Sequence, residues 1–142
     1  MPEHWQRKKV LVTGAGGFIG SHLVGALVER GAEVRTFVRY NSRGDPGLLR
    51  MLDARKTESI ELVAGDLRDE DAVRAAVKGC EVVFHLGALI SIPYSYKHPA
   101  EVVSTNIMGT LNVLLACRDS GVERLVHTST SEVYGTARVA PI

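Results

Sequence analysis

Residues 10–20 read Val-Leu-Val-Thr-Gly-Ala-Gly-Gly-Phe-Ile-Gly, and this stretch decides the fold. A short apolar run ends in three glycines with the spacing Gly-x-x-Gly-x-x-Gly, and an amphipathic pattern follows directly. This order is typical of a strand, a tight turn and the start of a helix. Gly14 permits the turn, Gly17 lets the backbone approach a ligand, and Gly20 lets the helix pack closely on the strand. Because the free N–H groups at a helix start favour an anion, the stretch predicts a pyrophosphate-binding turn.

Predicted strands and helices alternate along the rest of the chain. Further strands are predicted at 33–38, 60–64, 82–86 and 124–128, and helices at 21–31, 70–77 and 99–120. This alternation predicts an α/β fold with a doubly wound parallel sheet, the Rossmann fold, in the strand order 3-2-1-4-5. The ligand crevice is then expected where strands one and four diverge, beside the carboxyl ends of the strands.

Composition points to one soluble domain. With 142 residues and 45% hydrophobic content, the chain can bury one sizeable core, so we expect a single dinucleotide-binding domain over 1–142. A net charge of +1 gives no reason to expect binding to nucleic acid or a membrane surface. No apolar run approaches the roughly 20 residues that span a bilayer, and we expect a cytoplasmic protein. Cys80 and Cys117 are predicted to be buried, reduced thiols, and no metal site is expected.

Five motifs follow one another in a fixed order along the chain. They are Thr-Gly-x-x-Gly-x-x-Gly at 13–20, Asp-Leu at 66–67, His-Leu-Gly-Ala at 85–88, Asn-x-x-Gly-Thr at 106–110 and Ser-Thr-Ser-Glu-Val-Tyr-Gly at 129–135. In this order they resemble the extended short-chain dehydrogenase/reductase family. The last motif, with the segment at 39–44, looks most like the nucleotide-sugar 4,6-dehydratases, and less specifically like those acting on nucleotide-linked N-acetylglucosamine. The resemblance implies a nicotinamide cofactor and a nucleotide-sugar substrate.

The end of the second predicted strand bears on the choice of cofactor. Folds that bind NAD usually place a carboxylate there for the ribose hydroxyls, but this chain has Val38 followed by Arg39. Arg39, Asn41, Ser42 and Arg43 form a basic cluster, and an arginine can bind a 2′-phosphate through two parallel N–H bonds. We therefore expect NADP, with NAD as the alternative. Solvated loop charges are the other interpretation of these arginines.

The resemblance also implies roles for individual residues. Asp66 matches the family's adenine contact, although a helix N-cap is its alternative role. Asn106 is implied to support the active-site end of its helix, and Tyr94 and Ser95 to flank the sugar. His85 is expected to be a core histidine that bonds to backbone. The predicted cofactor-binding residues are Gly14, Gly17, Phe18, Ile19, Gly20, Arg39, Asn41, Ser42, Arg43, Asp66, Leu67, Leu86, Gly87, Ala88 and Asn106.

The segment after the fifth predicted strand carries the predicted catalytic residues Thr130, Ser131 and Glu132. By resemblance, Thr130 hydrogen-bonds the C4 hydroxyl that is oxidised, and Glu132 removes the proton at C5 that the C4 ketone acidifies. Water then leaves from C6, and the hydride returns there. Ser131 stands where a subgroup of the dehydratases carries Asp, so protonation of the leaving group is expected to involve Ser131 with water, or another residue. An exposed strand-end carboxylate is the other interpretation of Glu132.

The family's Tyr-x-x-x-Lys pair is not found between residues 1 and 142. We therefore expect an N-terminal fragment of a longer enzyme, inactive by itself, whose full-length form is a homodimer or higher homo-oligomer. The expected activity is that of a nucleotide-sugar 4,6-dehydratase. A 4-epimerase of the same family and a non-catalytic NAD(P)-binding or regulatory module are the alternatives.

Overall fold

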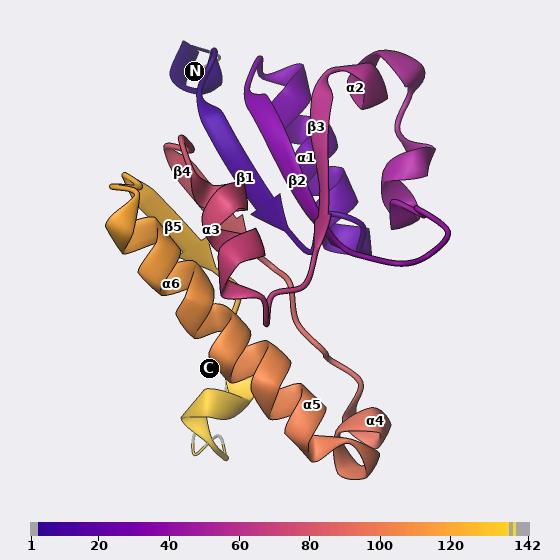
Figure 1. Ribbon diagram of the computed structural model, residues 1–142, viewed down its shortest axis with the longest axis vertical. Coiled ribbons are helices and arrows are strands. Elements are labelled where there is room, and N and C mark those ends of the chain that lie inside the picture. Colours follow the sequence, from indigo (N-terminus) through magenta and orange to yellow (C-terminus); the bar gives the residue numbers. More distant parts are fainter. Residues whose placement is uncertain (1–2, 137, 139–142) are drawn as a thin grey trace.

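A five-stranded parallel sheet forms the centre of the molecule in the computed structural model, which describes residues 3–136 and 138 (Figure 1). The strand order is β3-β2-β1-β4-β5, and all neighbouring strands pair in parallel. This confirms the predicted doubly wound fold and its strand order. The strands are β1 (Lys9–Thr13), β2 (Glu33–Arg39), β3 (Ile60–Gly65), β4 (Val82–His85) and β5 (Arg124–His127).

Helices connect the strands and cover both faces of the sheet (Figure 1). They are α1 (Phe18–Glu29), α2 (Ala54–Glu58), α3 (Glu70–Val77), α4 (Ile92–Lys97), α5 (Pro99–Val103) and α6 (Gly109–Asp119), with short 3₁₀ turns η1 (Glu3–Trp5), η2 (Gly47–Met51) and η4 (Ser131–Tyr134). The helix predicted at 21–31 begins three residues earlier, at Phe18, because the glycine turn leads directly into it. The helix predicted at 99–120 consists of α5, a π-helical stretch η3 (Ser104–Met108) and α6. Neither α2 nor α4 was predicted.

The core lies in two layers, one on each face of the sheet. Val10 and Val12 of β1 pack with α1, whereas Leu11 packs with α3 and α6 on the opposite face. Because both faces are covered, β1 is a nearly continuous apolar run. Cys80 and Cys117 are buried in the layer with α3 and α6, and burial raises the pKa of both thiols, that of Cys117 to about 11. Both are therefore protonated and poorly reactive at neutral pH.

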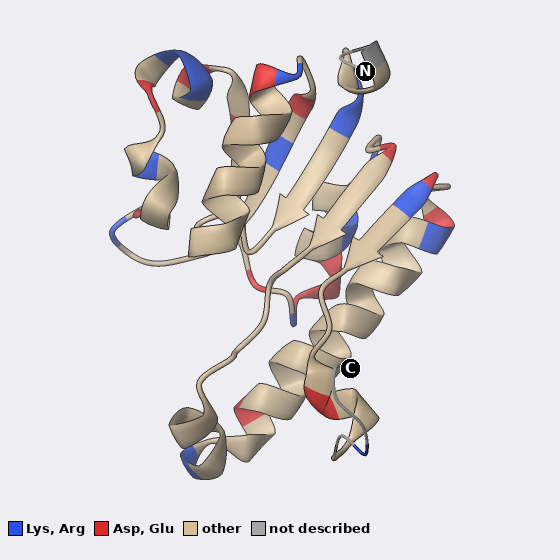
Figure 2. Cartoon of the chain, turned by 180° about the vertical axis from the view of Figure 1, so that it is seen from behind, with Lys and Arg blue, Asp and Glu red and all other residues tan. Residues whose placement is uncertain are grey.

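The run from Pro99 to Asp119 is long and apolar enough to cross a membrane by length and composition. The expectation that no such run exists was therefore wrong. One helix of this kind is weak evidence, because core helices of soluble proteins pass the same test. Three uncharged polar side chains of the run bond to the rest of the described domain: Asn106 to Leu89, Thr110 to His85, and Asn112 to the Leu67 carbonyl. Residues 102–117 of the run contain no Lys, Arg, Asp or Glu, and Figure 2 therefore shows most of this helical run in tan.

The turn after β1 needs glycine at position 14 for two independent reasons. Gly14 has φ of +67°, a conformation that L side chains rarely adopt. A Cβ added there would also lie 2.8 Å from the Gly87 nitrogen and 2.9 Å from its Cα. The ends of β1 and β4 therefore approach each other only because no side chain lies between them.

We predict that Gly14→Ala destabilises the domain more than Gly121→Ala. Gly121 also has φ of +67°, but an added Cβ there would meet no described atom within 4 Å. The free energy of unfolding of the Gly121 variant should fall by about 1–2 kcal/mol, because alanine is strained in this backbone conformation. The Gly14 variant must also displace the end of β4, which gives about 2–5 kcal/mol in all. Urea unfolding of both variants measures the difference, and equal losses would show that the close approach to Gly87 is unimportant.

Candidate cofactor site

A cavity of about 680 Å³ lies at the carboxyl ends of β1, β2 and β4. Its volume is within the range of roughly 300–1,000 Å³ that is usual for small-molecule sites, and it lies at the switch point between β1 and β4. The predicted residues that line it are Gly14, Gly17, Phe18, Ile19, Gly20, Arg39, Asn41, Leu86, Gly87 and Ala88. Residues not predicted from the sequence complete the wall: Gly16, Val38, Asp45, Pro46, Gly47, Ile90 and Thr128.

A second cavity of about 140 Å³ adjoins the first and has Gly14, Arg39, Gly87 and Ala88 in common with it. Its further lining residues are Phe37, Gly65, Asp66, Leu67, Leu89 and Thr105. The two cavities form one crevice that runs from the start of α1, past the end of β2, to the end of β3. This crevice lies at the carboxyl ends of the strands, which is where open α/β sheets bind their ligands.

The start of α1 is suited to an anion. Gly17 is the N-cap and has no side chain to accept the first helical N–H groups, and the first turn, 18–21, contains no acidic residue. A Cβ added at Gly17 would meet a single described atom, the Gly14 carbonyl oxygen at 3.3 Å. The positive end of the helix therefore opens into the cavity without a side chain in front of it.

The loop after β2 forms one wall of the larger cavity. Asn41 organises this loop: its Oδ1 accepts from the Arg43 and Asp45 nitrogens at 3.2 and 2.9 Å. The Leu48 nitrogen donates to the Gly16 carbonyl at 2.9 Å, which holds the far end of the loop against the glycine turn. Ser42 and Arg43, both predicted to bind the cofactor, line neither cavity in the described part of the chain. The predicted basic cluster is thus divided, with only Arg39 and Asn41 facing the crevice.

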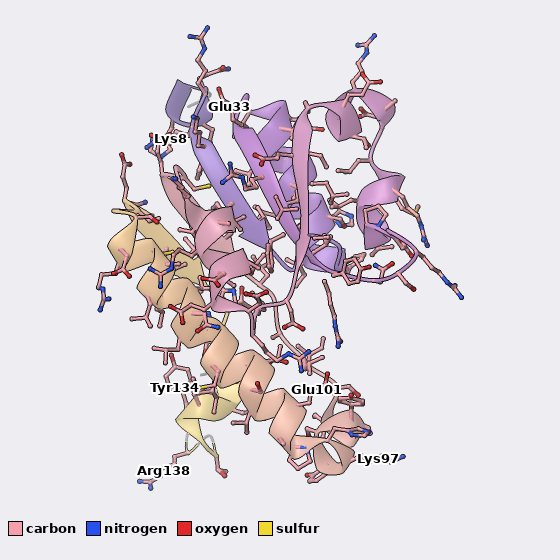
Figure 3. The ribbon with its side chains drawn as sticks, viewed as in Figure 1. Lys8, Glu33, Lys97, Glu101, Tyr134 and Arg138 are labelled. Carbon is pink, nitrogen blue, oxygen red and sulfur yellow. The ribbon has the colours of Figure 1, made fainter. Side chains whose placement is uncertain are left out.

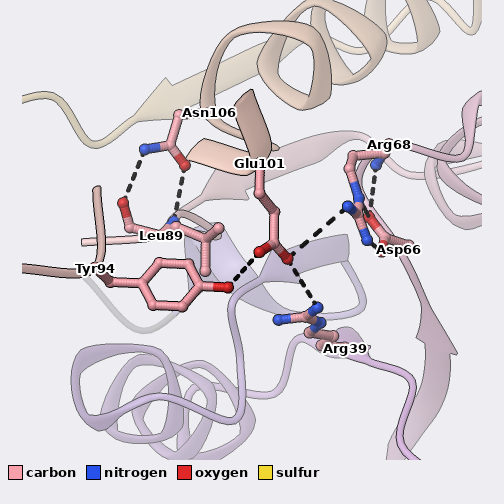
Figure 4. A network of polar contacts seen from close by, with 7 residues as sticks. All are labelled: Arg39, Asp66, Arg68, Leu89, Tyr94, Glu101 and Asn106. Carbon is pink, nitrogen blue, oxygen red and sulfur yellow. Dashed lines mark hydrogen bonds and ion pairs between the residues drawn. The ribbon is translucent and has the colours of Figure 1, made fainter. Parts of the chain in front are cut away.

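A network of charged residues lies beside the smaller cavity, and two of them, Arg39 and Asp66, line it (Figure 4). Asp66 accepts from Arg68 Nε at 2.9 Å and from Nη2 at 2.6 Å, and this pairing holds the pKa of Asp66 below its ordinary value. Arg39 Nη2 donates to Glu101 at 3.3 Å, and the Tyr94 hydroxyl donates to the same carboxylate. The hydrogen bond from Tyr94, with the charges of Arg39 and Arg68, lowers the pKa of Glu101. Both carboxylates, Asp66 and Glu101, are therefore ionised at neutral pH.

The alternative role of Asp66 as a helix N-cap is wrong. Asp69 caps α3, because its side chain accepts from the Asp71 and Ala72 nitrogens. Asp66 instead faces the smaller cavity beside Leu67. Glu101 and Arg68 were missed as members of this region, since neither belongs to a recognised motif.

His85 lies beneath the crevice, 1% exposed, and links β1 to the long helix through side chains. Its Nδ1 is 2.7 Å from the Thr13 hydroxyl, and its Nε2 is 3.0 Å from the Thr110 hydroxyl. The prediction of a buried core histidine is confirmed, but its expected bonding to backbone is wrong, because both partners are hydroxyl groups.

The neighbouring donors determine which nitrogen of His85 carries the proton. The Thr110 hydroxyl donates to the Asn106 carbonyl at 2.6 Å, so Thr110 accepts from His85 Nε2–H. Nδ1 then accepts from the Thr13 hydroxyl, whose oxygen accepts from the Gly87 N–H at 3.1 Å. The ring is therefore neutral. Burial, with a smaller contribution from His127, lowers the pKa of His85 to about 4.

Asn106 continues this chain of hydrogen bonds from the π-helical stretch. Its Oδ1 accepts from the Leu89 nitrogen at 2.8 Å, and its Nδ2 donates to the Leu89 carbonyl at 2.9 Å. Both polar groups of the side chain are therefore occupied by the backbone after β4. Asn106 shapes the crevice wall through Leu89 and is not among the residues that line either cavity.

The predicted catalytic and sugar-flanking residues lie outside the crevice. Thr130, Ser131 and Glu132 are exposed at η4, where Thr130 Oγ1 accepts from the Glu132 nitrogen at 3.3 Å. Ser95 donates to the Ile92 carbonyl within α4 at 2.7 Å, and Tyr94 donates to Glu101. None of these five residues lines either cavity within the described ranges 3–136 and 138. Figure 3 shows Glu101 near Lys97 at the lower end of the helical run, and Tyr134 below β5.

A family model described as GDP-mannose 4,6 dehydratase matches residues 11–142. The chain belongs to this family. Its relatives include nucleotide-sugar epimerases, a nucleotide-sugar decarboxylase and reductases, and the match to the extended short-chain dehydrogenase/reductase family confirms the resemblance that the five motifs carried. The family establishes a NAD-binding fold of this class, whereas the sugar and the reaction of this chain are matters for proposal.

Individual relatives cover nearly all of this chain, but the chain covers only part of each. The 2-alkyl-3-oxoalkanoate reductase of Stenotrophomonas maltophilia is 42% identical over 125 residues, which are 88% of this chain and 34% of that protein. The solved UDP-N-acetylglucosamine 4-epimerase of Methanobrevibacter ruminantium, in complex with UDP-N-acetylmuramic acid, is 33% identical with a TM-score of 0.83, over 96% of this chain and 42% of its own. The solved UDP-glucose-4-epimerase of Stenotrophomonas maltophila with bound NAD is 30% identical and has a TM-score of 0.78. The match covers 96% of this chain and 41% of that protein. The chain therefore spans about a third of the length of the curated relative.

We predict that acidification destabilises the domain through His85. The unfolded ring binds a proton near pH 6.5, whereas the folded ring binds one only near pH 4, so stability is retained above pH 6.5 and falls as the pH drops toward 4. Over this window the loss attributable to His85 is roughly 3 kcal/mol. Urea unfolding between pH 7 and 4.5 measures it, and His85→Gln should flatten the pH dependence.

His22→Gln is the matched control, because His22 is exposed on α1. The free energy of unfolding of the His22→Gln variant should depend on pH as that of the wild type does. If His85→Gln does not fold, nuclear magnetic resonance titration of the wild-type ring gives the same test. A His85 ring that protonates near pH 6.5 in the folded protein would contradict the prediction.

Proposed function

We propose that this chain is the dinucleotide-binding part of a nucleotide-sugar 4,6-dehydratase. The observation that carries the proposal is the single crevice that joins the glycine turn at α1 to Asp66 and Leu67 at β3. The crevice offers a helix start for a pyrophosphate, small residues for close approach, and a carboxylate for an adenine amine. Membership of the GDP-mannose 4,6 dehydratase family supports the reaction class.

For the cofactor we propose NADP, with NAD as the alternative. Arg39 faces both cavities and directly follows Val38, the position at which a carboxylate would bind the ribose hydroxyls of NAD, so it can bind a 2′-phosphate. The Stenotrophomonas epimerase with bound NAD supports the alternative. When bound, the cofactor supplies the acceptor for hydride.

In the proposed reaction, the residues after β5 move protons at the sugar. Thr130 holds the C4 hydroxyl by a hydrogen bond, and Glu132 takes the C5 proton once the C4 ketone has acidified it. Ser131 cannot donate a proton as readily as a carboxylic acid, so it acts with a water molecule as the C6 hydroxyl leaves. Asn106 orders the wall of the crevice through the Leu89 backbone.

A nucleotide-sugar 4-epimerase is the second candidate, because both solved relatives described above are named as 4-epimerases. An epimerase reverses the configuration at C4 and needs no base at C5. The role of Glu132 therefore separates the two candidates.

We predict that the chain binds NADPH and NADH, and that Gly17→Val weakens binding of both at least about tenfold. Valine at this position places its side chain in front of the helix start. We expect the variant to fold after a small shift of the turn, since the described atom that an added Cβ meets is the Gly14 oxygen, in a tight contact of 3.3 Å. Cofactor fluorescence titration measures affinity, and thermal unfolding checks the fold. Thr57→Val, on exposed α2, is the control for surface valine. A Gly17 variant that binds as tightly as the wild type would argue against this crevice as the site.

A second prediction separates the dehydratase from the epimerase. In a protein that joins this chain to the remaining length of its relatives, Glu132→Gln should lower dehydration by about 10²–10⁴-fold, because the amide cannot accept the C5 proton. Cofactor affinity should stay within about twofold. Incorporation of solvent deuterium at C5 is the measurement, with Glu123→Gln as the control, an exposed glutamate beside the opposite end of β5. Unchanged dehydration would remove Glu132 as the base, and C4 epimerisation without deuterium at C5 would favour the second candidate.

A further inference from the structure

The carboxylate of Glu101 contacts a residue of the cofactor crevice, Arg39, from an element outside the usual recognition positions, although Glu101 itself lines neither cavity. Glu101 lies on α5, one helical turn before Thr105, which lines the smaller cavity. It binds Arg39, which lines both cavities. Figure 4 shows the Glu101 side chain directed between Tyr94 and Arg39. The Arg39–Glu101 pair therefore lies where the adenosine end of the ligand is expected.

The two arginines of this region differ in their freedom to meet a ligand. Arg68 makes two hydrogen bonds to Asp66 and is 3.9 Å from Glu101. Arg39 makes a single bond of 3.3 Å to Glu101, and its side chain is 65% exposed. Glu101 is 24% exposed and is also held by the Tyr94 hydroxyl. Arg39 can therefore turn to a new partner more readily than Glu101 can leave its place.

We propose that Glu101 is a specificity-determining residue of the cofactor site, where its carboxylate competes with the 2′-phosphate of NADP for Arg39 and so shifts preference toward NAD. The inference rests on the proposed function, because it assumes that the crevice binds a nicotinamide dinucleotide. A 2′-phosphate carries about −1.5 to −2 charges and needs Arg39 as its donor, so it must share or displace the existing partner. A neutral ribose leaves the Arg39–Glu101 pair intact.

This arrangement supplies from α5 the carboxylate that β2 lacks. In a site of the usual kind, the acidic residue at the end of β2 repels a 2′-phosphate and binds the ribose hydroxyls. Here β2 ends with Arg39, and the negative charge comes from a residue 62 positions later in the chain. In this proposal, Glu101 repels the 2′-phosphate. How free Arg39 is to bind that phosphate then depends on how firmly the Tyr94 hydroxyl holds Glu101.

Affinities of the 142-residue chain for NADPH and NADH test the proposal by fluorescence titration. Glu101→Gln should tighten NADPH binding about fivefold and change NADH binding less than about twofold. The amide keeps the size of the side chain and can still accept from Tyr94. In an Arg39→Ala background, the same substitution should give no gain for NADPH. The gain should also shrink in 0.5 M salt, since exposed charges are then screened.

Two further variants separate this effect from general changes of charge or fold. Glu58→Gln, on exposed α2, removes one negative charge far from the crevice and should leave both affinities unchanged. Tyr94→Phe keeps the Glu101 carboxylate but removes its hydrogen bond, and it should raise NADPH affinity less than Glu101→Gln does. Thermal unfolding confirms that each variant is folded.

The outcomes distinguish this inference from the proposed function. If the wild type binds neither dinucleotide, both fail. If it binds them but Glu101→Gln leaves the ratio of the two affinities unchanged, the inference fails and the proposed function stands. An equal gain in the Arg39→Ala background would show a general charge effect and would also overturn the inference.

Discussion

The close approach of the β1 turn to the end of β4 is the constraint on which the crevice depends. Gly14 and Gly87 lie so near each other that a Cβ on Gly14 would be within 2.9 Å of the Gly87 backbone. Both residues line both cavities, so their contact forms the floor of the whole site. A side chain at Gly14 would separate the strand ends and raise this floor toward the expected pyrophosphate.

A chain of hydrogen bonds holds that floor in place from below. It runs from the Gly87 N–H to Thr13, His85 and Thr110, and then to the backbone of Asn106. Each member donates in one direction, so a protonated His85 would leave the Thr13 hydroxyl with two donors facing it. Burial, with a smaller contribution from His127, lowers the pKa of this ring to about 4, so the neutral form that this chain of hydrogen bonds uses is present at neutral pH.

The sequence predicted what local patterns and topology determine. The order of the strands follows from alternating apolar runs and crossover rules, and the glycine turn follows from the position of three spaced glycines between an apolar run and a helical pattern. The π-helical stretch at Ser104–Met108 and the division of the loop after β2 could not be predicted, because they depend on contacts with other segments. Asn106, for example, has both its polar groups bound to Leu89, 17 residues earlier.

The pairing of charges beside the crevice also depends on contacts between distant segments, so the sequence could not predict it. Read along the chain, Arg39 is part of a basic cluster, and that pattern favours a phosphate. In the folded domain, β2, the turn after β3 and α5 bring Arg39 and Arg68 beside Asp66 and Glu101, so the formal charge of the group is zero. A motif at the end of β2 records one of these four charges and gives no information on the other three. Cofactor preference in such a site is therefore a property of the whole charge group, and the residue that completes it comes from the helix that also carries Asn106 and Thr110.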